Sequence, residues 1–333
     1  MVTPRKTKIN TRKDRKKEHT TNQVVNYESL TPSLSLQLAA PHTWVSAIIP
    51  VLVSAAYVGV TYSGKINIVV LLVLLAISIL MQSSVNTLND YFDFKKGTDS
   101  LDNSSEDSFD AVLVYHQLKP HHVLCLGIGY LTAAFVLGCY IISVSDFVPL
   151  IIGCIGALAI VFYSGGKTPI SYLPIGELVS GLVMGGLIPL ACVYVLSGVL
   201  DWFSLVVVLP TIIGIGMILA TNNTCDIEKD IEAKRKTLSV VLGRKRAVFA
   251  YRCAIIGWLI ITVGLVGILF TSGLPIMVFM LLCMFAVLRA LLKNPLKQKS
   301  RDGAMSQIVT SNILVGTFYS LAIVVSSCIT WIA

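Results

Sequence analysis

Charged residues are scarce in this sequence. Asp, Glu, Lys and Arg make up 13% of its 333 residues, whereas a soluble domain carries about a quarter. Hydrophobic residues make up 55%, and they gather in runs such as Ile68–Leu80, Val123–Ser143 and Leu205–Thr221 that approach the roughly 20 residues needed to cross a bilayer. The composition excludes an ordinary soluble globular protein and predicts an integral membrane protein in a lipid bilayer.

Paired cysteines and a secretory signal are also missing. The eight Cys residues are scattered, mostly within apolar segments, and no CxxC or Cys/His ligand spacing occurs, which excludes a disulfide framework and a zinc site. The first forty residues contain no apolar run, so they do not form a signal peptide. Eight basic residues lie between Arg5 and Lys17. This composition predicts a disordered cytoplasmic tail over residues 1–40 that is attracted to anionic lipids rather than to nucleic acid.

The apolar segments predict an all-α, polytopic membrane helix bundle over residues 41–333. Nine spans are expected near residues 42–62, 67–88, 122–143, 148–164, 174–197, 203–222, 248–270, 274–292 and 306–332. With a cytoplasmic N-terminus, the tail, the loops after the even-numbered spans and the adjoining helix ends hold every Lys and Arg except Lys65. This division fits the positive-inside rule. The odd number of spans then places the C-terminus outside the membrane.

Two acidic segments, each beginning with Asn, stand at the cytoplasmic ends of the second and sixth expected spans. The first is Asn89–Asp93, followed by Asp99, and the second is Asn222–Asp230. Residues four apart share a helix face, so Asn89 and Asp93 pair, and three oxygen-bearing side chains of the second segment form a column. The two similar segments, four spans apart, also indicate a weak internal repeat of the kind that brings matching polar segments to one site.

Clustered carboxylates at a membrane boundary repel one another and need a counter-charge. Mg²⁺ prefers hard oxygen ligands and commonly bridges carboxylates to substrate phosphates. Two facing segments therefore predict a site that holds a diphosphate through Mg²⁺. Solvated acidic loops without function are the simpler alternative, but two such segments on one membrane face disfavour it.

On these motifs the chain resembles the UbiA superfamily of intramembrane prenyltransferases over about residues 40–332. The likeness is greatest to the menaquinone-pathway branch, which prenylates 1,4-dihydroxy-2-naphthoate. The residues Tyr163–Gly166, with Pro169, Tyr172 and Gly176-Glu177, resemble the middle loop of that branch. The resemblance implies nine helices around a central cavity. It also implies transfer of a polyprenyl group from polyprenyl diphosphate to the naphthoate with loss of CO₂, which would give a demethylmenaquinone in a bacterial cell membrane.

The resemblance also implies roles for individual residues. The implied metal ligands are Asn89, Asp90, Asp93, Asp99, Asp226 and Asp230. The residues expected to bind the diphosphate are Asn89, Lys95, Lys96, Asn222, Arg235 and Lys236. The residues expected to act in catalysis are Asp93, Asp226, Lys167 (the one basic residue of the middle loop) and Tyr163 (whose ring could stabilise an allylic cation). Cys225 departs from the family, which often carries Arg there, and Lys119 or Lys167 is expected to substitute as a point charge.

Two alternatives remain open from the sequence. A different aromatic acceptor, such as 4-hydroxybenzoate or homogentisate, would use the same diphosphate site. A cation-coupled transporter is the alternative from another class, although its site would be expected near the bilayer midplane rather than at helix ends.

Overall fold

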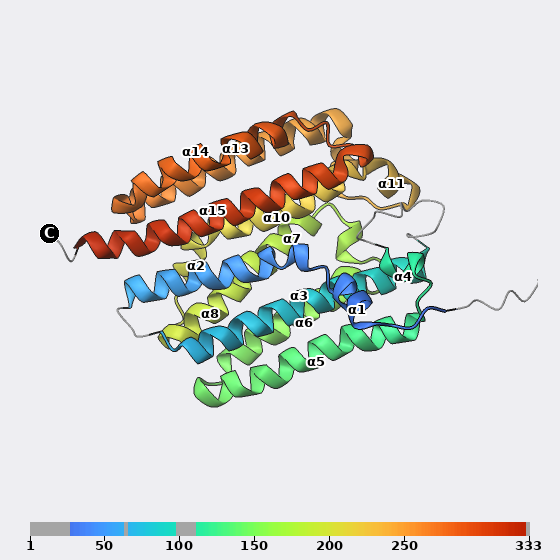
Figure 1. Ribbon diagram of the computed structural model, residues 1–333, viewed down its shortest axis with the longest axis horizontal. Helices are drawn as coiled ribbons and strands as arrows, with labels where there is room; N and C mark the ends of the chain where they lie inside the picture. Colours follow the sequence, from blue (N-terminus) through green and yellow to red (C-terminus); the bar gives the residue numbers. More distant parts are fainter. Residues whose placement is uncertain (1–26, 63–65, 98–110, 331–333) are drawn as a thin grey trace, which may run out of the picture.

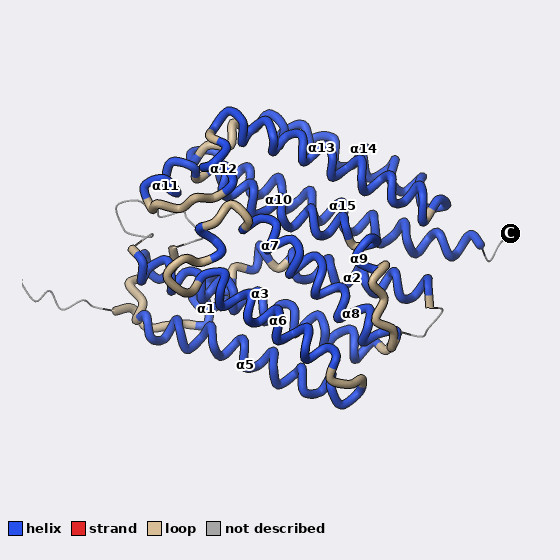
Figure 2. The backbone as a smooth tube through the Cα atoms, turned by 180° about the vertical axis from the view of Figure 1, so that it is seen from behind, coloured by secondary structure: helices blue, strands red, loops and turns tan. Residues whose placement is uncertain are grey.

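The computed structural model describes residues 27–62, 66–97 and 111–330, and within these ranges the chain folds into helices without a β-strand. The helices form one elongated bundle in which most axes run roughly along its length (Figures 1 and 2). In chain order they are α1 (Pro32–Ala39), α2 (Val45–Thr61), α3 (Ile68–Lys96), α4 (Val112–Tyr115), α5 (Pro120–Val144), α6 (Val148–Ser164), α7 (Gly176–Leu182), the π-helical turn η4 (Val183–Leu187), α8 (Ile188–Ser197), α9 (Ser204–Val207), α10 (Leu209–Cys225), α11 (Ile227–Glu232), α12 (Leu238–Leu242), α13 (Arg244–Leu269), α14 (Leu274–Lys293) and α15 (Arg301–Thr330).

Local sequence explains where the long helices begin and end. Proline occupies the first or second position of α5, α6, α10 and α14, where its missing N–H has no helical partner to lose. The side chain of Asn67 accepts hydrogen bonds from the first N–H groups of α3. Gly97 ends α3 in the left-handed conformation, with φ of 70°. The same glycine follows the first acidic segment, so this segment lies on the last turns of a continuous helix.

The bundle has two flanks with a middle layer between them. Helices α3, α5 and α6 lie on one flank, α13, α14 and α15 on the other, and α2, α7, α8 and α10 run between them (Figures 1 and 2). Buried methionines of α14 (Met277, Met280 and Met284) pack in the core of the second flank. The short helices α11 and α4 lie at one end of the bundle, and the C-terminus lies at the opposite end.

The outer helices present apolar side chains to their surroundings. In the most apolar stretch of α5 only 17% of the residues are buried, and exposed side chains include Phe135, Phe162 and Leu282. Such a surface suits lipid and not water. Of the helices described, six are long and apolar enough to span a membrane, and a seventh span results if α2 is joined to the segment before it across a 54° bend. The chain is thus an integral membrane protein. All nine expected spans fall on helical segments, but α6, with 17 residues, is short, and the count of nine stays a prediction.

The prediction of a disordered tail over residues 1–40 is wrong for the last residues of that range. Residues 32–39 form α1, which Thr31 caps through its hydroxyl. Leu34 and Leu38 of this helix are buried against Tyr91, Leu113 and their neighbours. The basic composition that indicated disorder belongs to residues before Glu28, and residues 1–26 lie outside the part of the chain that the structure describes. The ordered domain therefore begins before residue 41.

An apolar cavity of about 420 Å³ lies between α3, α5, α6 and the η4–α8 segment. On α3 its wall runs from Leu74 to Val85. At its far end Leu74, Ile141 and Cys192 line the cavity and also belong to a buried cluster with Val51 and Val70. At its near end, Gln82 and Val85 stand seven and four residues before Asn89, one or two helical turns from the acidic segment on the same face of α3.

Candidate functional site

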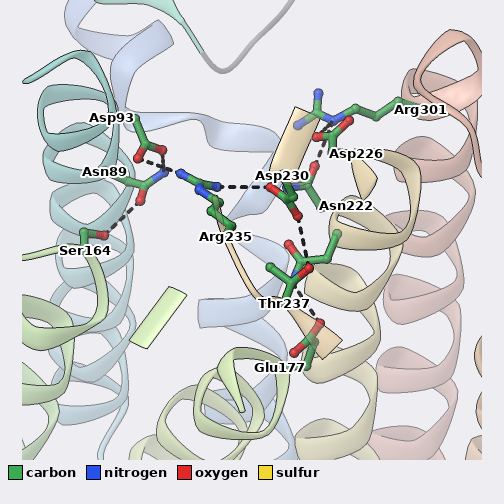
Figure 3. A network of polar contacts seen from close by, with 11 residues as sticks. Asn89, Asp93, Ser164, Glu177, Asn222, Asp226, Asp230, Arg235, Thr237 and Arg301 are labelled. Atoms are coloured by element: carbon green, nitrogen blue, oxygen red, sulfur yellow. Dashed lines mark hydrogen bonds and ion pairs between the residues drawn. The ribbon is translucent and has the colours of Figure 1, made fainter. Parts of the chain in front are cut away.

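The first half of the site is the last two turns of α3. Asn89 donates to Asp93 across one turn (3.2 Å), and its carbonyl oxygen accepts a hydrogen bond from the Ser164 hydroxyl (2.9 Å) at the end of α6. The i, i+4 spacing read from the sequence places both side chains on one face, as expected. The contact with Ser164 fixes the amide of Asn89 so that it holds the carboxylate of Asp93 in place (Figure 3).

Arg235 joins the two acidic segments. One of its terminal nitrogens lies 2.7 Å from a carboxylate oxygen of Asp93, and the other lies 3.7 Å from one of Asp230. Its guanidinium also stacks over the Tyr172 ring, 4.9 Å from the centroid. All three ionic side chains are between 5% and 15% exposed, so this bridge is largely shielded from water. The expectation that the two segments, more than a hundred residues apart, face one another is confirmed (Figure 3).

A tight turn after α11 aims Arg235 at the site. Lys234 takes the left-handed conformation with φ of 57°, which a residue other than glycine adopts rarely. The N–H of Arg235 then returns to the Asp230 carbonyl (2.8 Å), and the N–H of Lys236 donates to the Tyr172 carbonyl (2.9 Å). The second of these bonds ties the turn to the middle loop.

The second acidic segment is divided between two arginines. Helix α10 ends at Cys225 and α11 begins at Ile227, with Asp226 at the break. Backbone bonds still run from Asp226 to Asn222 and from Asp230 to Asp226. The expected column therefore persists, but Asp230 faces Arg235, whereas Asp226 and Asn222 face Arg301 of α15, whose Nε lies 3.0 Å and 2.8 Å from their oxygens (Figure 3).

Asp230 has an unusual electrostatic environment. Its side chain is 5% exposed and accepts a hydrogen bond from the Thr237 hydroxyl (3.1 Å). Burial is the dominant influence and raises the pKa of Asp230 to about 6, although Arg235 and Thr237 both favour its ionised form. Its protonation therefore changes close to neutral pH.

The middle loop contributes a further buried carboxylate below the arginine bridge. Glu177, at the start of α7, accepts a hydrogen bond from the Asn223 side chain (2.8 Å), and its other oxygen has no hydrogen-bond partner among the described residues. The Tyr163 hydroxyl interacts electrostatically with Glu177, Arg235, Asp93 and Asp230. Tyr163 is thus close to the site, as its expected role requires.

The expected cationic residues differ in their positions. Lys96 donates to the Ser164 carbonyl (2.5 Å) and lies over the Tyr172 ring at 5.1 Å from its centroid, at the edge of the site. Lys95 is exposed and lies over Tyr91, 5.8 Å from the centroid. Lys236 and Lys167 are exposed, and neither forms an ion pair with a described residue. The expected catalytic role of Lys167 receives no support from its position.

Only some of the expected metal ligands lie in the site. Asp93, Asp226 and Asp230 lie in the site with Asn89, and their hard oxygen donors fit Mg²⁺. Asp90 is buried on the side of α3 that faces α4, where it accepts a hydrogen bond from the N–H of Leu113 (3.4 Å), so its position does not favour metal binding. Asp99 lies outside the described residues. Across residues 27–62, 66–97 and 111–330, no three His, Cys, Asp or Glu side chains converge as a closed metal site would. A metal here would complete its coordination with oxygen ligands from water or from its substrate.

Comparison with known proteins agrees with this arrangement. The UbiA prenyltransferase family model matches residues 47–324, which include both acidic segments and the middle loop. The chain belongs to the UbiA prenyltransferase family. It is therefore an integral membrane prenyltransferase, and the family gives no support to the cation-coupled transporter.

Individual relatives divide into two groups. The chain is 34% identical to the 1,4-dihydroxy-2-naphthoate octaprenyltransferase of Bacillus subtilis over 212 residues, 64% of this chain and 67% of the relative. It is 25% identical to UbiA prenyltransferase domain-containing protein 1 of Xenopus tropicalis over 293 residues, 86% and 80% of the two chains. Among solved structures, a UbiA homologue from Archaeoglobus fulgidus bound to GPP and Mg²⁺ shares the fold, with a TM-score of 0.63 and 13% identity over 87% of this chain and 99% of the other.

Arg301 is the residue of the site that sequence reasoning missed. It is one of 26 Lys and Arg residues and precedes the expected last span by five positions. No motif marks it, because its contacts with Asp226 and Asn222 depend on the packing of α15 against α10.

Proposed function

We propose that the protein transfers a polyprenyl group from polyprenyl diphosphate to 1,4-dihydroxy-2-naphthoate, with loss of CO₂ and dependence on Mg²⁺, giving a demethylmenaquinone in its reduced, quinol form. One observation carries the proposal. Asp93 of α3 and Asp230 of α11 face one another across the Arg235 guanidinium, at 2.7 Å and 3.7 Å. Asp93 lies on the face of α3 that, further along the helix, lines the 420 Å³ apolar cavity. A diphosphate with a long apolar tail has the same division into an anionic head and a hydrophobic chain.

In the proposed reaction the head of the substrate binds at the acidic segments and its tail enters the cavity. Asn89, Asp93, Asp226 and Asp230 would hold Mg²⁺, which neutralises charge that develops on the leaving diphosphate. Lys96 and Arg235 add positive charge at the edge and the centre of the site. The C–O bond of the allylic diphosphate breaks, and the ring carbon bearing the carboxylate forms the new C–C bond. The carboxylate leaves as CO₂, and its bonding electrons return to the ring.

The remaining residues protect this chemistry. The cavity walls, formed by side chains such as Leu74, Val85 and Ile160, exclude water that would otherwise trap an allylic cation. Tyr163 lies near the arginine bridge, where its ring can stabilise positive charge on the prenyl group. The Tyr172 ring instead holds the cationic groups of Arg235 and Lys96 beside the site.

The naphthoate acceptor is supported by the relative at 34% identity, whose own name specifies that acceptor. The membrane arrangement in the proposal has nine spans, a cytoplasmic N-terminus and site, and a C-terminus on the outer side of a bacterial cell membrane. The positive-inside distribution supports this orientation. The basic tail would rest on the cytoplasmic lipid surface.

The test is an assay of the full chain in nanodiscs with 1,4-dihydroxy-2-naphthoate, a series of allylic diphosphates, and either Mg²⁺ or EDTA. Prenylated naphthoquinone is expected only with Mg²⁺, and Asp93→Ala and Asp226→Ala are each expected to lose about a hundredfold or more in rate. Glu228→Ala is the matched control, because Glu228 lies on α11 but is 63% exposed and pairs with Arg244 outside the site.

Three outcomes of this assay test the metal requirement, the acceptor and the prenyl transfer separately. Product that forms equally well in EDTA would refute the metal requirement. Prenylation of 4-hydroxybenzoate or homogentisate, with none of the naphthoate, would keep the prenyl transfer and refute the acceptor. If no acceptor is prenylated and no diphosphate is released, the proposal fails altogether.

A further inference from the structure

Arg301 reaches the site from an element that neither acidic segment belongs to. It is the first residue of α15, and its Nε contacts Asp226 at 3.0 Å and Asn222 at 2.8 Å. The side chains of Arg301 and Asp226 are only 15% and 12% exposed. The contact is thus a shielded ion pair rather than a surface pair, and removing one partner of such a pair leaves an uncompensated charge.

The carboxylates of the two acidic segments outnumber the guanidiniums that contact them. Asp93, Asp226 and Asp230 contribute three carboxylates, against the guanidiniums of Arg235 and Arg301. A diphosphate cannot approach this arrangement without an added cation, because like charges repel. A divalent cation in turn competes with the arginines for the same carboxylate oxygens, which are the ligands it prefers.

We propose that Arg301 is a diphosphate-binding residue that changes partner when the substrate enters. Without substrate it neutralises Asp226. When divalent metal and diphosphate enter together, Asp226 turns to the metal and Arg301 binds diphosphate oxygens. The guanidinium has five N–H donors in a fork that matches phosphate oxygens, and a shielded guanidinium that has lost its carboxylate needs another anion. The inference rests on the proposed function, because it requires a diphosphate at the acidic segments.

This exchange gives Arg301 opposite effects on two ligands. It opposes the binding of metal alone, since the metal must displace it from Asp226. It favours the binding of diphosphate in the presence of metal, since it then has a new partner. A residue that only supports the fold would weaken both ligands when replaced, and a residue that only neutralises Asp226 would leave diphosphate binding unchanged.

The experiment measures Mn²⁺ binding by electron paramagnetic resonance, with the full chain in phosphatidylcholine nanodiscs, with and without inorganic pyrophosphate. In Arg301→Gln, Mn²⁺ alone is expected to bind about tenfold more tightly than in the original chain. Pyrophosphate in the presence of Mn²⁺ is expected to bind about tenfold more weakly. Each change corresponds to the energy of one charge-assisted hydrogen bond. Arg246→Gln is the control, because Arg246 is an exposed residue near the start of α13, and both affinities should stay within twofold of the original chain.

Arg301→Lys tests the same idea with the charge retained. Mn²⁺ alone should bind as in the original chain, whereas pyrophosphate should bind several-fold more weakly because the fork is lost. The proposal is overturned if both affinities fall together in Arg301→Gln, if only the Mn²⁺ affinity changes, or if Arg301→Lys alters neither ligand. If the original chain binds no pyrophosphate in the presence of Mn²⁺, the proposed function itself fails, and this inference fails with it.

Discussion

The length of prenyl chain that the cavity accepts can be altered from α5 without touching the acidic site. Gly138 lines the cavity near its far end, three residues before Ile141, and a Cβ built there meets no atom within 4 Å. Gly138→Phe would therefore place its ring in open space. On the antiparallel pair α3 and α5, this position lies far from Asn89, so only the distal part of a long tail should be displaced.

The magnitude follows from the apolar group that is displaced. One isoprene unit has five carbons, and moving each from an apolar cavity into water costs about 0.8 kcal/mol, so the upper limit for one displaced unit is about 4 kcal/mol, or about a thousandfold in kcat/KM. A unit displaced into lipid loses only its packing contacts, so the expected loss for a chain that reaches the far end of the cavity lies below this limit. Shorter diphosphates that end before Gly138 should be used as well as before.

The assay offers a mixture of allylic diphosphates of increasing length and resolves the products by mass spectrometry. Gly129→Phe is the matched control, since Gly129 is an exposed glycine on the same helix, also without a neighbour within 4 Å, and does not line the cavity. An equal loss for short and long diphosphates in Gly138→Phe, or the same change of length preference in Gly129→Phe, would refute the assignment of this cavity to the tail.

Two further predictions concern the acid limb of the pH profile and the packing of α7–η4 on α10. Because burial raises the pKa of Asp230 to about 6 and its carboxylate form is the proposed ligand, kcat/KM should fall as pH drops below about 6. Thr237→Val removes a hydrogen bond that favours the ionised form, so this limb should move to higher pH, and an unmoved limb would show that another group controls it. Gly185→Ala places a Cβ 2.5 Å from the Ile212 backbone, whereas Gly186→Ala meets that residue's side chain at 3.5 Å. Gly185→Ala should lower the free energy of unfolding by about 1–3 kcal/mol, and with it the melting temperature, whereas Gly186→Ala should change the melting temperature little. Equal melting temperatures for the two variants would contradict the close packing.

The sequence predicts most of the fold because a bilayer leaves few choices. Apolar runs of about 20 residues must become helices, since no water is present to satisfy the backbone, and the expected spans fall on helices for that reason. The prediction from sequence is wrong where the local composition does not reflect a contact made with a distant part of the chain. Residues 32–39 follow a basic, polar stretch, yet Leu34 and Leu38 are buried beneath the end of α3, a contact that depends on the position of a helix more than fifty residues away.

The site shows the same limit on a smaller scale. The pairing of Asn89 with Asp93 follows from helical spacing alone, and the structure contains it. The assignment of Asp226 to one arginine and Asp230 to another does not follow from spacing, because it depends on the break at Asp226 and on a helix from the far end of the chain. Asp90 illustrates the reverse case, since its acidic neighbours suggested a ligand, but its position on α3 turns it towards Leu113.

The continuity of α3 has a consequence for how this chain can change in evolution. The wall of the cavity at Leu74 to Val85 and the side chains of Asn89 and Asp93 in the acidic segment belong to one unbroken helix. One inserted residue between them would rotate the acidic side chains by about 100° and shift them by about 1.5 Å. An insertion of a whole turn would restore their direction but move them about 5 Å further from the cavity. The number of residues between the cavity wall and the acidic segment is therefore constrained, as well as their chemical type. Alignments of relatives should show substitutions between Leu74 and Asp93 but neither insertions nor deletions.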